Sequence, residues 1–313
     1  MPRILYLSTK FDRPVGGVRM IFHHVRELRR LGFDASVVHT GGAEAPTWFA
    51  SDAPIISGSP SLSVEPEDIL VVPEVAPNIL STACTGPCRT VLFCQNQFQI
   101  FTGLRDIAGW EEAGVHFAMY CSQIAADQVG RCFSFRDAAV IRSGIDHTLF
   151  RPQQKKLCVV LMPRKRPEDV RLIRRIFERQ WPQYIDYPWF SANNQPESIV
   201  AEMLSKSSIF LSLSHREGLG LPPLEAMASG CLVAGFTGQG GRDYATPDNG
   251  LWVEDDDLYG AADAVGRALE MFLERPEEAA AMSTAAQVTA ARYSFDAMRE
   301  DLQSFWGRIL ASG

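Results

Sequence analysis

The sequence predicts an α/β protein with two domains, each built around a parallel β-sheet. The chain opens with an apolar run, a loop containing Gly16 and Gly17, a helical pattern and a second apolar run, which is the order of a βαβ unit. Residues 209–235 repeat the order of strand, glycine loop, helix and strand. A length of 313 residues accommodates two domains of ordinary size.

In the first half of the chain, apolar runs of strand length alternate with helical patterns. Apolar residues recur at helical spacing from Val18 to Leu31, and Gly32 then ends the predicted helix. A shorter helix is expected over residues 122–129. The expected strands are residues 3–7, 34–39, 69–72, 91–93, 117–121 and 138–141.

The second half continues the alternation. The expected strands are residues 157–162, 185–190, 209–213 and 231–235, and the expected helices are residues 168–180, 197–205 and 258–273. After Tyr293, a final helix carries an apolar stripe formed by Met298, Leu302, Phe305, Trp306 and Ile309.

The composition is that of a soluble globular protein. Hydrophobic residues make up 46% and charged residues 21% of the chain, and the net charge of -7 argues against a general nucleic-acid binder. No apolar run approaches membrane-spanning length, and the first residues enter a strand pattern directly, so we expect a cytoplasmic protein without a signal peptide. Cys84 and Cys88 lack a second cysteine or histidine pair at metal-ligand spacing, so we expect reduced thiols and no structural metal.

Positive charge is concentrated in one segment. Residues 151–179 contain ten basic and three acidic residues, so this segment carries +7 and the remainder of the chain -14. Such a segment is usually a solvated helix face, but it would also suit a diphosphate or an anionic membrane surface. Peripheral contact with a membrane is therefore one hypothesis for it.

Residues 214–234 form the stretch with the clearest chemical meaning. Gly218 and Gly220 allow the backbone to approach a ligand closely, and the pair Pro222-Pro223 suits the first turn of a helix that ends at Gly230. The amino end of that helix offers unpaired N–H groups and a partial positive charge. The stretch therefore predicts a site for a polar or anionic ligand.

Two carboxylates flank the glycines. Glu217 lies on the loop and Glu225 eight positions later in the helix, so both can face the same cleft. Taken singly, the first is an ordinary solvated loop residue and the second an ordinary first-turn glutamate. Together with the glycines and prolines, they favour a hydroxyl-rich ligand such as a sugar or a ribose, because carboxylates accept the hydrogen bonds that hydroxyls donate.

The run from Glu217 to Glu225 resembles the Glu-x7-Glu signature of the family 4 retaining glycosyltransferases, which belong to the group 1 glycosyltransferases. This resemblance implies the GT-B fold, in which two Rossmann-like domains face a cleft. It also implies a nucleotide-sugar donor, retention of anomeric configuration and no metal or other cofactor. Glu217 and the amides of Gly218, Leu219, Gly220 and Leu221 would hold the donor sugar, and Glu225 would bind the ribose.

Further positions match the family less closely. Gly16-Gly17 lacks the third glycine of a dinucleotide fingerprint and can be a simple tight turn, but its position resembles the family's amino-terminal Gly-Gly loop near the donor diphosphate. Arg164 matches the family arginine that follows the first strand of the second domain, where a cation clamps the diphosphate. Lys165 is out of register with the family lysine, so Arg166 or neither residue remains an alternative for it.

The segment from Ile141 to Pro152 resembles the family segment that leaves the first domain, with Ser143 in place of the usual asparagine. We therefore expect a first domain of residues 1–152, joined by the final helix at about 295–313, and a donor domain of residues 153–294. Gln95 and Asn96 stand where many members have a histidine. Amides can bind an acceptor sugar but cannot titrate.

The predicted function is thus transfer of a sugar to a hydroxyl of a glycan, glycolipid or small molecule. Two alternatives remain open, a sugar-nucleotide epimerase and a non-catalytic binding or partner subunit with this fold. The epimerase would need titrating groups around the sugar that the sequence does not offer. The intact pair Glu217 and Glu225 argues against the non-catalytic subunit.

Overall fold

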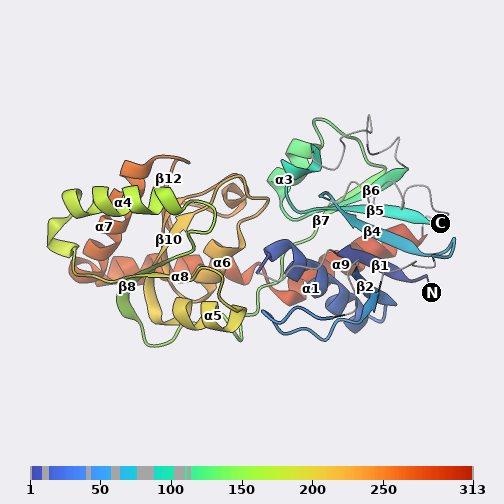
Figure 1. Cartoon of the computed structure of the whole chain (residues 1–313), viewed down its shortest axis with the longest axis horizontal. Helices are drawn as coiled ribbons and strands as arrows, with labels where there is room; N and C mark the ends of the chain where they lie inside the picture. The colour runs from blue at the N-terminus through green and yellow to red at the C-terminus, as the bar shows by residue number, and fades with distance from the viewer. Residues whose placement is uncertain are drawn as a thin grey trace. The chain divides into compact units, whose positions relative to one another are not determined.

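The computed structural model describes residues 2–8, 14–39, 44–57, 64–75, 88–101, 110 and 114–311. It divides into two compact units (Figure 1), of which unit 1 comprises Met1–Gly144 with Phe295–Gly313, and unit 2 comprises Ile145–Ser294. The chain leaves unit 1 eight residues before the predicted boundary at 152. The reason is that Ile145 already pairs with unit 2, its N–H donating to Tyr293 O at 3.0 Å.

Within the described residues, unit 1 is built on a sheet of seven parallel strands in the order β3-β2-β1-β4-β5-β6-β7. The chain first adds strands on one side of β1 and then returns to place β4 on the other side. This reversal puts a topological switch point between β1 and β4. The strands are β1 (Ile4–Ser8), β2 (Ala35–His39), β3 (Ile55–Ser57), β4 (Ile69–Pro73), β5 (Arg89–Cys94), β6 (Val115–Tyr120) and β7 (Asp137–Val140).

The helices of unit 1 include α1 (Gly16–Arg30), α3 (Gln123–Val129) and α9 (Phe295–Ala311), with the short 3-10 helix η1 (Gln99–Phe101). The prediction of a Gly16-Gly17 loop before the helix is wrong in one respect, because both glycines lie in the first turn of α1. Val15 precedes them without a side-chain cap. The opening amides of α1 therefore lack partners within the helix itself.

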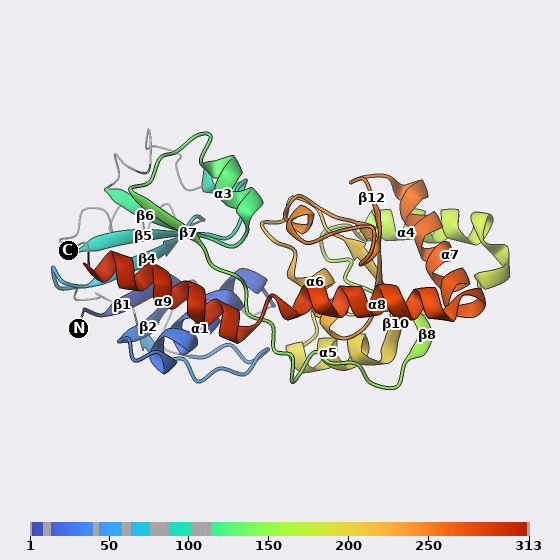
Figure 2. The same ribbon diagram turned by 180° about the vertical axis from the view of Figure 1, so that it is seen from behind.

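Ion pairs attach α9 to the rest of unit 1. Glu27 on α1 is fully buried and receives Nη1 of Arg299 from α9 at 2.6 Å. Arg142, which follows β7, donates from Nε to Asp301 at 2.7 Å, and Arg308 donates to Asp137 at 2.9 Å. Figure 2 shows α9 alongside α1 on this unit. The last helix in the sequence thus completes the first unit.

Unit 2 carries a sheet of five parallel strands among the described residues, in the order β12-β11-β10-β8-β9. The chain places β9 on one side of β8 and then returns to place β10 on the other side, so the switch point of this sheet lies between β8 and β10. Its strands are β8 (Lys156–Leu161), β9 (Trp189–Ser191), β10 (Ser207–Leu213), β11 (Leu232–Phe236) and β12 (Leu251–Val253). The predicted fold class, two parallel-sheet α/β domains, is confirmed.

The helices of unit 2 cover this sheet, and α4 packs against α7. They are α4 (Pro167–Gln180), α5 (Glu197–Lys206), α6 (Leu221–Ala228), α7 (Leu258–Glu274) and α8 (Pro276–Ala291), with the 3-10 helices η2 (Pro182–Tyr184) and η3 (Gly240–Asp243). None of the helices in the described ranges combines the length and apolar character that a membrane crossing needs.

The prediction of a strand over residues 185–190 is largely wrong. The chain forms η2 first, and β9 begins only at Trp189. Tyr184 stacks on Trp181 with ring centroids 5.8 Å apart, which holds this part of the chain in a turn after α4. Helix α8 was not predicted as a separate helix; Pro276 occupies its first turn, the position that proline tolerates best.

Replacing Glu27 by glutamine should lower the stability of unit 1 by about 3 kcal/mol, because Arg299 and Arg30 lose a buried carboxylate partner. Urea unfolding, with peptides of unit 1 followed by hydrogen exchange, measures the effect. Glu300→Gln is the matched control, because Glu300 pairs with Arg142 while 75% exposed and should change stability by less than about 0.5 kcal/mol. Equal effects of the two variants would contradict the role given to Glu27.

Candidate functional site

The loop after β10 and the start of α6 form the centre of the candidate site. Gly220 is the residue before α6 and has φ of 86°, a conformation that favours glycine. A Cβ atom there would also lie 3.1 Å from Oη of Tyr244. The helix starts at Leu221 and accepts the two prolines in its first turn. Residues 218–220, which lead into this helix, are buried, so only glycine fits the close packing at Gly220.

A second glycine loop, between β11 and Tyr244, packs directly on the first. A Cβ atom at Gly240 would come within 2.5 Å of the Cα of Leu219 and closer still to Gly218 O. The N–H of Gly240 donates to Glu217 O at 3.1 Å. The two loops are therefore in backbone contact, and this contact fixes the position of the Glu217 main chain.

Tyr244 holds the same loop in place through a hydrogen bond to its backbone. It is buried and donates from Oη to Gly220 O at 2.8 Å. Burial raises the pKa of Tyr244 well above its ordinary value, so it remains a hydrogen-bond donor. Asn249 in turn donates from Nδ2 to Tyr244 O at 2.7 Å. Sequence reasoning missed Tyr244, because nothing local distinguishes it from a core tyrosine.

The structure brings Lys165 and Glu217 together. Lys165 follows β8 and Glu217 follows β10, the adjacent strands that flank the switch point. Nζ of Lys165 lies 2.8 Å from Oε1 of Glu217. Their side chains are 46% and 27% exposed, so the pair remains partly solvated and is weak. A cation and an anion thus meet where a sheet of this type binds its ligand.

Arg166 points elsewhere. Its guanidinium pairs with Asp169 and with Asp256, and it lies 4.7 Å over the ring centre of Phe236. Of the two cations that the sequence left open, Lys165 is therefore the one beside Glu217. Arg164 lies in the same turn with its side chain exposed.

The two carboxylates of the motif occupy different environments. Glu225 lies in the second turn of α6 and is only 4% exposed, whereas Glu217 is accessible on its loop. The motif therefore offers one buried acceptor and one lysine-paired acceptor, rather than two equivalent groups.

In unit 1 the structure places Gln95 against Gly17. Gln95 directly follows β5, and a Cβ atom at Gly17 would lie 3.3 Å from both Nε2 and Oε1 of its side chain. Asn96 accepts the N–H of Phe98 at Oδ1 at 3.0 Å. The predicted Gly-Gly pair and the predicted acceptor-side amides are thus neighbours at the carboxyl edge of the first sheet.

Glu74 is a further residue at this edge, which sequence reasoning missed. It follows β4 directly and is 2% exposed. Burial raises the pKa of Glu74 to about 7, against hydrogen bonds from the backbone of Gln95 and Asn96 that favour the charged form. An acid directly after a buried strand of a parallel sheet was the signal available in the sequence.

The two histidines of α1, His23 and His24, are buried and pack against aromatic rings. His24 is buried and stacks on Phe93 with ring centroids 4.4 Å apart, and burial lowers its pKa to about 3. Burial also lowers the pKa of His23 well below its ordinary value. In the part of the chain that the structure describes, no three His, Cys, Asp or Glu residues gather as a metal site.

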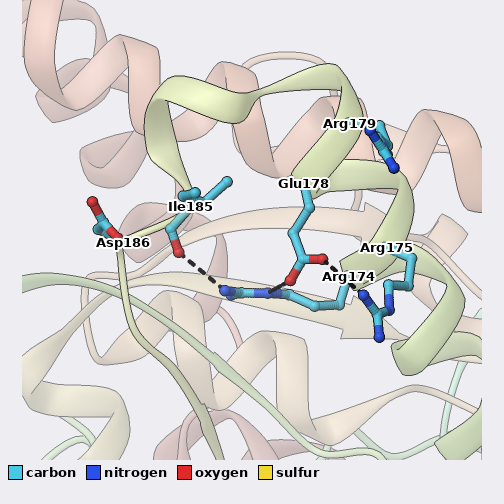
Figure 3. Close-up of a pocket in the computed structure, with 6 residues that line it drawn as sticks. All are labelled: Arg174, Arg175, Glu178, Arg179, Ile185 and Asp186. Atoms are coloured by element: carbon cyan, nitrogen blue, oxygen red, sulfur yellow. Dashed lines mark hydrogen bonds and ion pairs between the residues drawn. The ribbon is translucent and has the colours of Figure 1, made fainter.

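The basic segment separates into buried and exposed parts. Nζ of Lys155 is turned inward and donates to the carbonyls of Leu204, Ser207 and Ser229 at 3.0, 2.8 and 2.5 Å. Further along, Arg174 and Arg175 pair with Glu178 on the outer side of α4 (Figure 3). These residues belong to a surface pocket, and none of the predicted site residues lines it. The pocket is lined by Arg174, Arg175, Glu178, Arg179, Ile185 and Asp186.

Comparison with solved structures identifies the class of this fold. Over the whole chain, the structure is similar to a sucrose-phosphate synthase from Thermosynechococcus elongatus, with a TM-score of 0.74 at 13% identity and 100% of both chains covered. It is also similar to HepE of Anabaena, solved with UDP and glucose, with a TM-score of 0.72 at 13% identity and the same coverage. The chain therefore has the GT-B fold of glycosyltransferases.

Sequence comparison defines the family. Residues 189–289 match the model described as glycosyl transferases group 1. The chain is also 28% identical over 235 residues to an alpha-1,6-glucosyltransferase of Actinobacillus pleuropneumoniae serotype 7, covering 72% of this chain and 71% of the relative. These matches confirm the resemblance to the group 1 glycosyltransferases that the central motif predicted.

Replacing Gly240 by alanine should destabilise unit 2 by about 1–3 kcal/mol, because the new methyl group forces the two glycine loops apart. Thermal and urea unfolding measure the loss. Gly307→Ala on α9 is the control, since a Cβ atom there meets nothing within 4 Å and alanine favours a helix. A fully stable Gly240→Ala protein would show that the loop contact is not a constraint.

Proposed function

We propose that the protein is a family 4 retaining glycosyltransferase that moves a hexosyl group from a nucleotide-sugar to an acceptor hydroxyl. The observation that carries this proposal is the meeting of Lys165 and Glu217 at the switch point of unit 2, beside the amino end of α6. A lysine and a helix start suit a diphosphate, and a carboxylate beside them suits sugar hydroxyls.

In this proposal unit 2 binds the donor. Glu217 accepts hydrogen bonds from the sugar, and the amides of Gly218, Leu219, Gly220 and Leu221 face the same ligand. Glu225 accepts from the ribose, a role that its burial supports because a desolvated carboxylate forms stronger hydrogen bonds. UDP-glucose is the first donor to test, because HepE was solved with it and the sequence relative is a glucosyltransferase.

In this proposal the positive charges of Lys165 and Arg164 stabilise the negative charge that develops on the departing diphosphate. The pair between Lys165 and Glu217 is partly solvated, so Lys165 can exchange its carboxylate partner for a phosphate oxygen at low cost. Preorganised charges of this kind lower a barrier by several kcal/mol, on the order of 3 kcal/mol for one donor group. No metal is required in this scheme, since the cations come from the chain.

In this proposal unit 1 binds the acceptor, with Gln95 and Asn96 as acceptor-side residues, and Gly16 and Gly17 contact the donor diphosphate. The acceptor is a hydroxyl of a glycan, a glycolipid or a small molecule. Retention is supported by the name of the sequence relative, which forms an α-1,6 linkage. UDP-glucose is itself an α-glucoside, so an α-linked product from this donor corresponds to retention.

A thermal-shift and calorimetric panel of UDP-, GDP-, dTDP- and ADP-sugars should show one nucleotide that binds specifically. Glu225→Gln should weaken that binding about 10- to 100-fold, the range expected for loss of a hydrogen bond to a charged group. Glu202→Gln is the control, because Glu202 is an exposed partner of Lys206 on α5. If no nucleotide-sugar binds to the well-folded protein, the donor role of unit 2 is wrong and a non-catalytic subunit becomes the better interpretation.

With the bound donor and an acceptor panel, transfer should give an α-linked product and should continue in EDTA. Lys165→Met should lower kcat/KM about 100-fold through loss of leaving-group stabilisation, whereas Lys206→Met, which removes an exposed lysine from α5, should not. The anomeric proton coupling in NMR spectra reports the linkage. An inverted product, or an epimerised donor without transfer, would refute the proposed reaction.

A further inference from the structure

The switch point of the first sheet contains a buried acid that the proposed reaction does not yet use. Glu74 follows β4, and the reversal of strand order falls between β1 and β4. Helix α1, which opens with Gly16 and Gly17, is the next described element after β1. By the rule for open α/β sheets, ligands bind in the crevice at such a reversal. Glu74 therefore lies at the place in unit 1 where a ligand is expected.

The carboxyl of Glu74 is only partly satisfied. It accepts hydrogen bonds from the backbone N–H groups of Gln95, of Glu74 itself and of Asn96, and Gln95 and Asn96 lie in the turn after the neighbouring strand β5. Its Oε2 atom is buried and has no hydrogen-bond partner among the residues that the structure describes. A buried carboxyl with one oxygen unsatisfied costs stability. Positions that break the packing rules in this way concentrate at functional sites.

The turn that Glu74 holds has its own contact with the glycines of α1. The Gln95 side chain lies against Gly17, close enough that a Cβ atom there would meet both of its polar atoms at 3.3 Å. A change in the bonds to the backbone of Gln95 would therefore move this amide relative to the start of α1. Three segments, after β4, after β5 and at α1, are thus coupled through one carboxylate.

We propose that Glu74 is a positioning residue for the acceptor side of the transfer reaction, holding the Gln95–Asn96 turn so that the Gln95 side chain stays beside Gly17. The proposal rests on the glycosyltransferase function proposed above. Gln95 and Asn96, which stand where many family members have a histidine, cannot titrate. In this proposal Glu74 is the titratable group on the acceptor side of unit 1. The charged carboxylate accepts the two backbone N–H groups more strongly than the neutral acid does.

Protonation of Glu74 should weaken the hold on this turn near neutral pH. Burial raises its pKa to about 7, so the carboxylate gains a proton as the pH falls from 8 to 6. The titratable group that faces it from β5 is Cys94, whose own pKa is raised well above its usual range by burial, and Cys94 lies next to Cys121. Tyr120 on β6 also has its pKa raised by burial, so it stays neutral in this window.

The first test measures the turn itself and needs no substrate. Hydrogen exchange of peptides that contain Gln95 and Asn96 is compared between wild type and Glu74→Gln at the same pH, at pH 6 and at pH 8. Wild type should protect these amides more than the variant at pH 8, and the difference should shrink at pH 6. Glu67→Gln, an exposed acid of the same unit, should behave as wild type. Equal protection in wild type and Glu74→Gln at pH 8 overturns the proposal.

The second test measures function, with UDP-glucose and a panel of alkyl glycosides as acceptors. Wild-type kcat/KM for the acceptor should fall about tenfold from pH 8 to pH 6, following the ionised fraction of a group with a pKa near 7. Glu74→Gln should change by less than about twofold over the same window. UDP-glucose binding by unit 2 should be unaffected in Glu74→Gln. If kcat/KM of Glu74→Gln fell with pH as steeply as that of wild type, this result would falsify the positioning role.

The two proposals fail in different ways. If the wild-type protein binds no nucleotide-sugar, the glycosyltransferase reaction is refuted. Hydrogen exchange still decides whether Glu74 holds the turn. Normal donor binding and transfer, together with a wild-type pH profile in Glu74→Gln, refutes the positioning role alone. If Glu74→Gln folds poorly, Glu74→Asp provides the second variant, since it keeps the charge but shortens the reach to the two N–H groups, and it should lower protection at pH 8.

Discussion

The backbone contact between the two glycine loops of unit 2 is the constraint on which the proposed donor site depends. Gly240 lies so close to Gly218 that no side chain fits between them, and its N–H holds Glu217 O. Because the contact joins main chains, it holds the two loops together with no side chain between them. Tyr244 secures the arrangement through Gly220. The position of Glu217 is therefore built before any ligand arrives, which is what preorganised binding requires.

The two units share one structural feature, a reversal of strand order in the sheet. Each sheet reverses its strand order once, and the candidate residues gather at that reversal, between β8 and β10 in unit 2 and between β1 and β4 in unit 1. The two edges differ in electrostatics. Unit 2 presents a cation, Lys165, paired with a carboxylate, whereas unit 1 presents amides, glycines and the buried Glu74. A charged diphosphate suits the first edge and an uncharged hydroxyl suits the second.

Sequence reasoning recovered the fold because both signals are local: apolar runs of strand length and glycines that end helices. It also recovered the central motif, whose residues are consecutive in the chain. It could not choose between Lys165 and Arg166, because the choice is made by Asp256, which is ninety positions from Arg166 and captures its guanidinium. An acid directly after a buried strand marked Glu74 in the sequence, but its burial and unsatisfied oxygen depend on neighbouring strands and could not be read from adjacent residues.

The weak pair between Lys165 and Glu217 has a physical purpose in the proposed reaction. A lysine left alone at a helix start would repel the partial positive charge there, and a carboxylate left alone would repel a diphosphate. Together they are nearly neutral, and because both remain partly solvated their separation costs about 1 kcal/mol or less. In the proposed reaction, donor binding replaces this pair, giving the lysine a phosphate oxygen and the carboxylate the sugar hydroxyls. A buried, tightly bonded pair at the same place would resist that exchange.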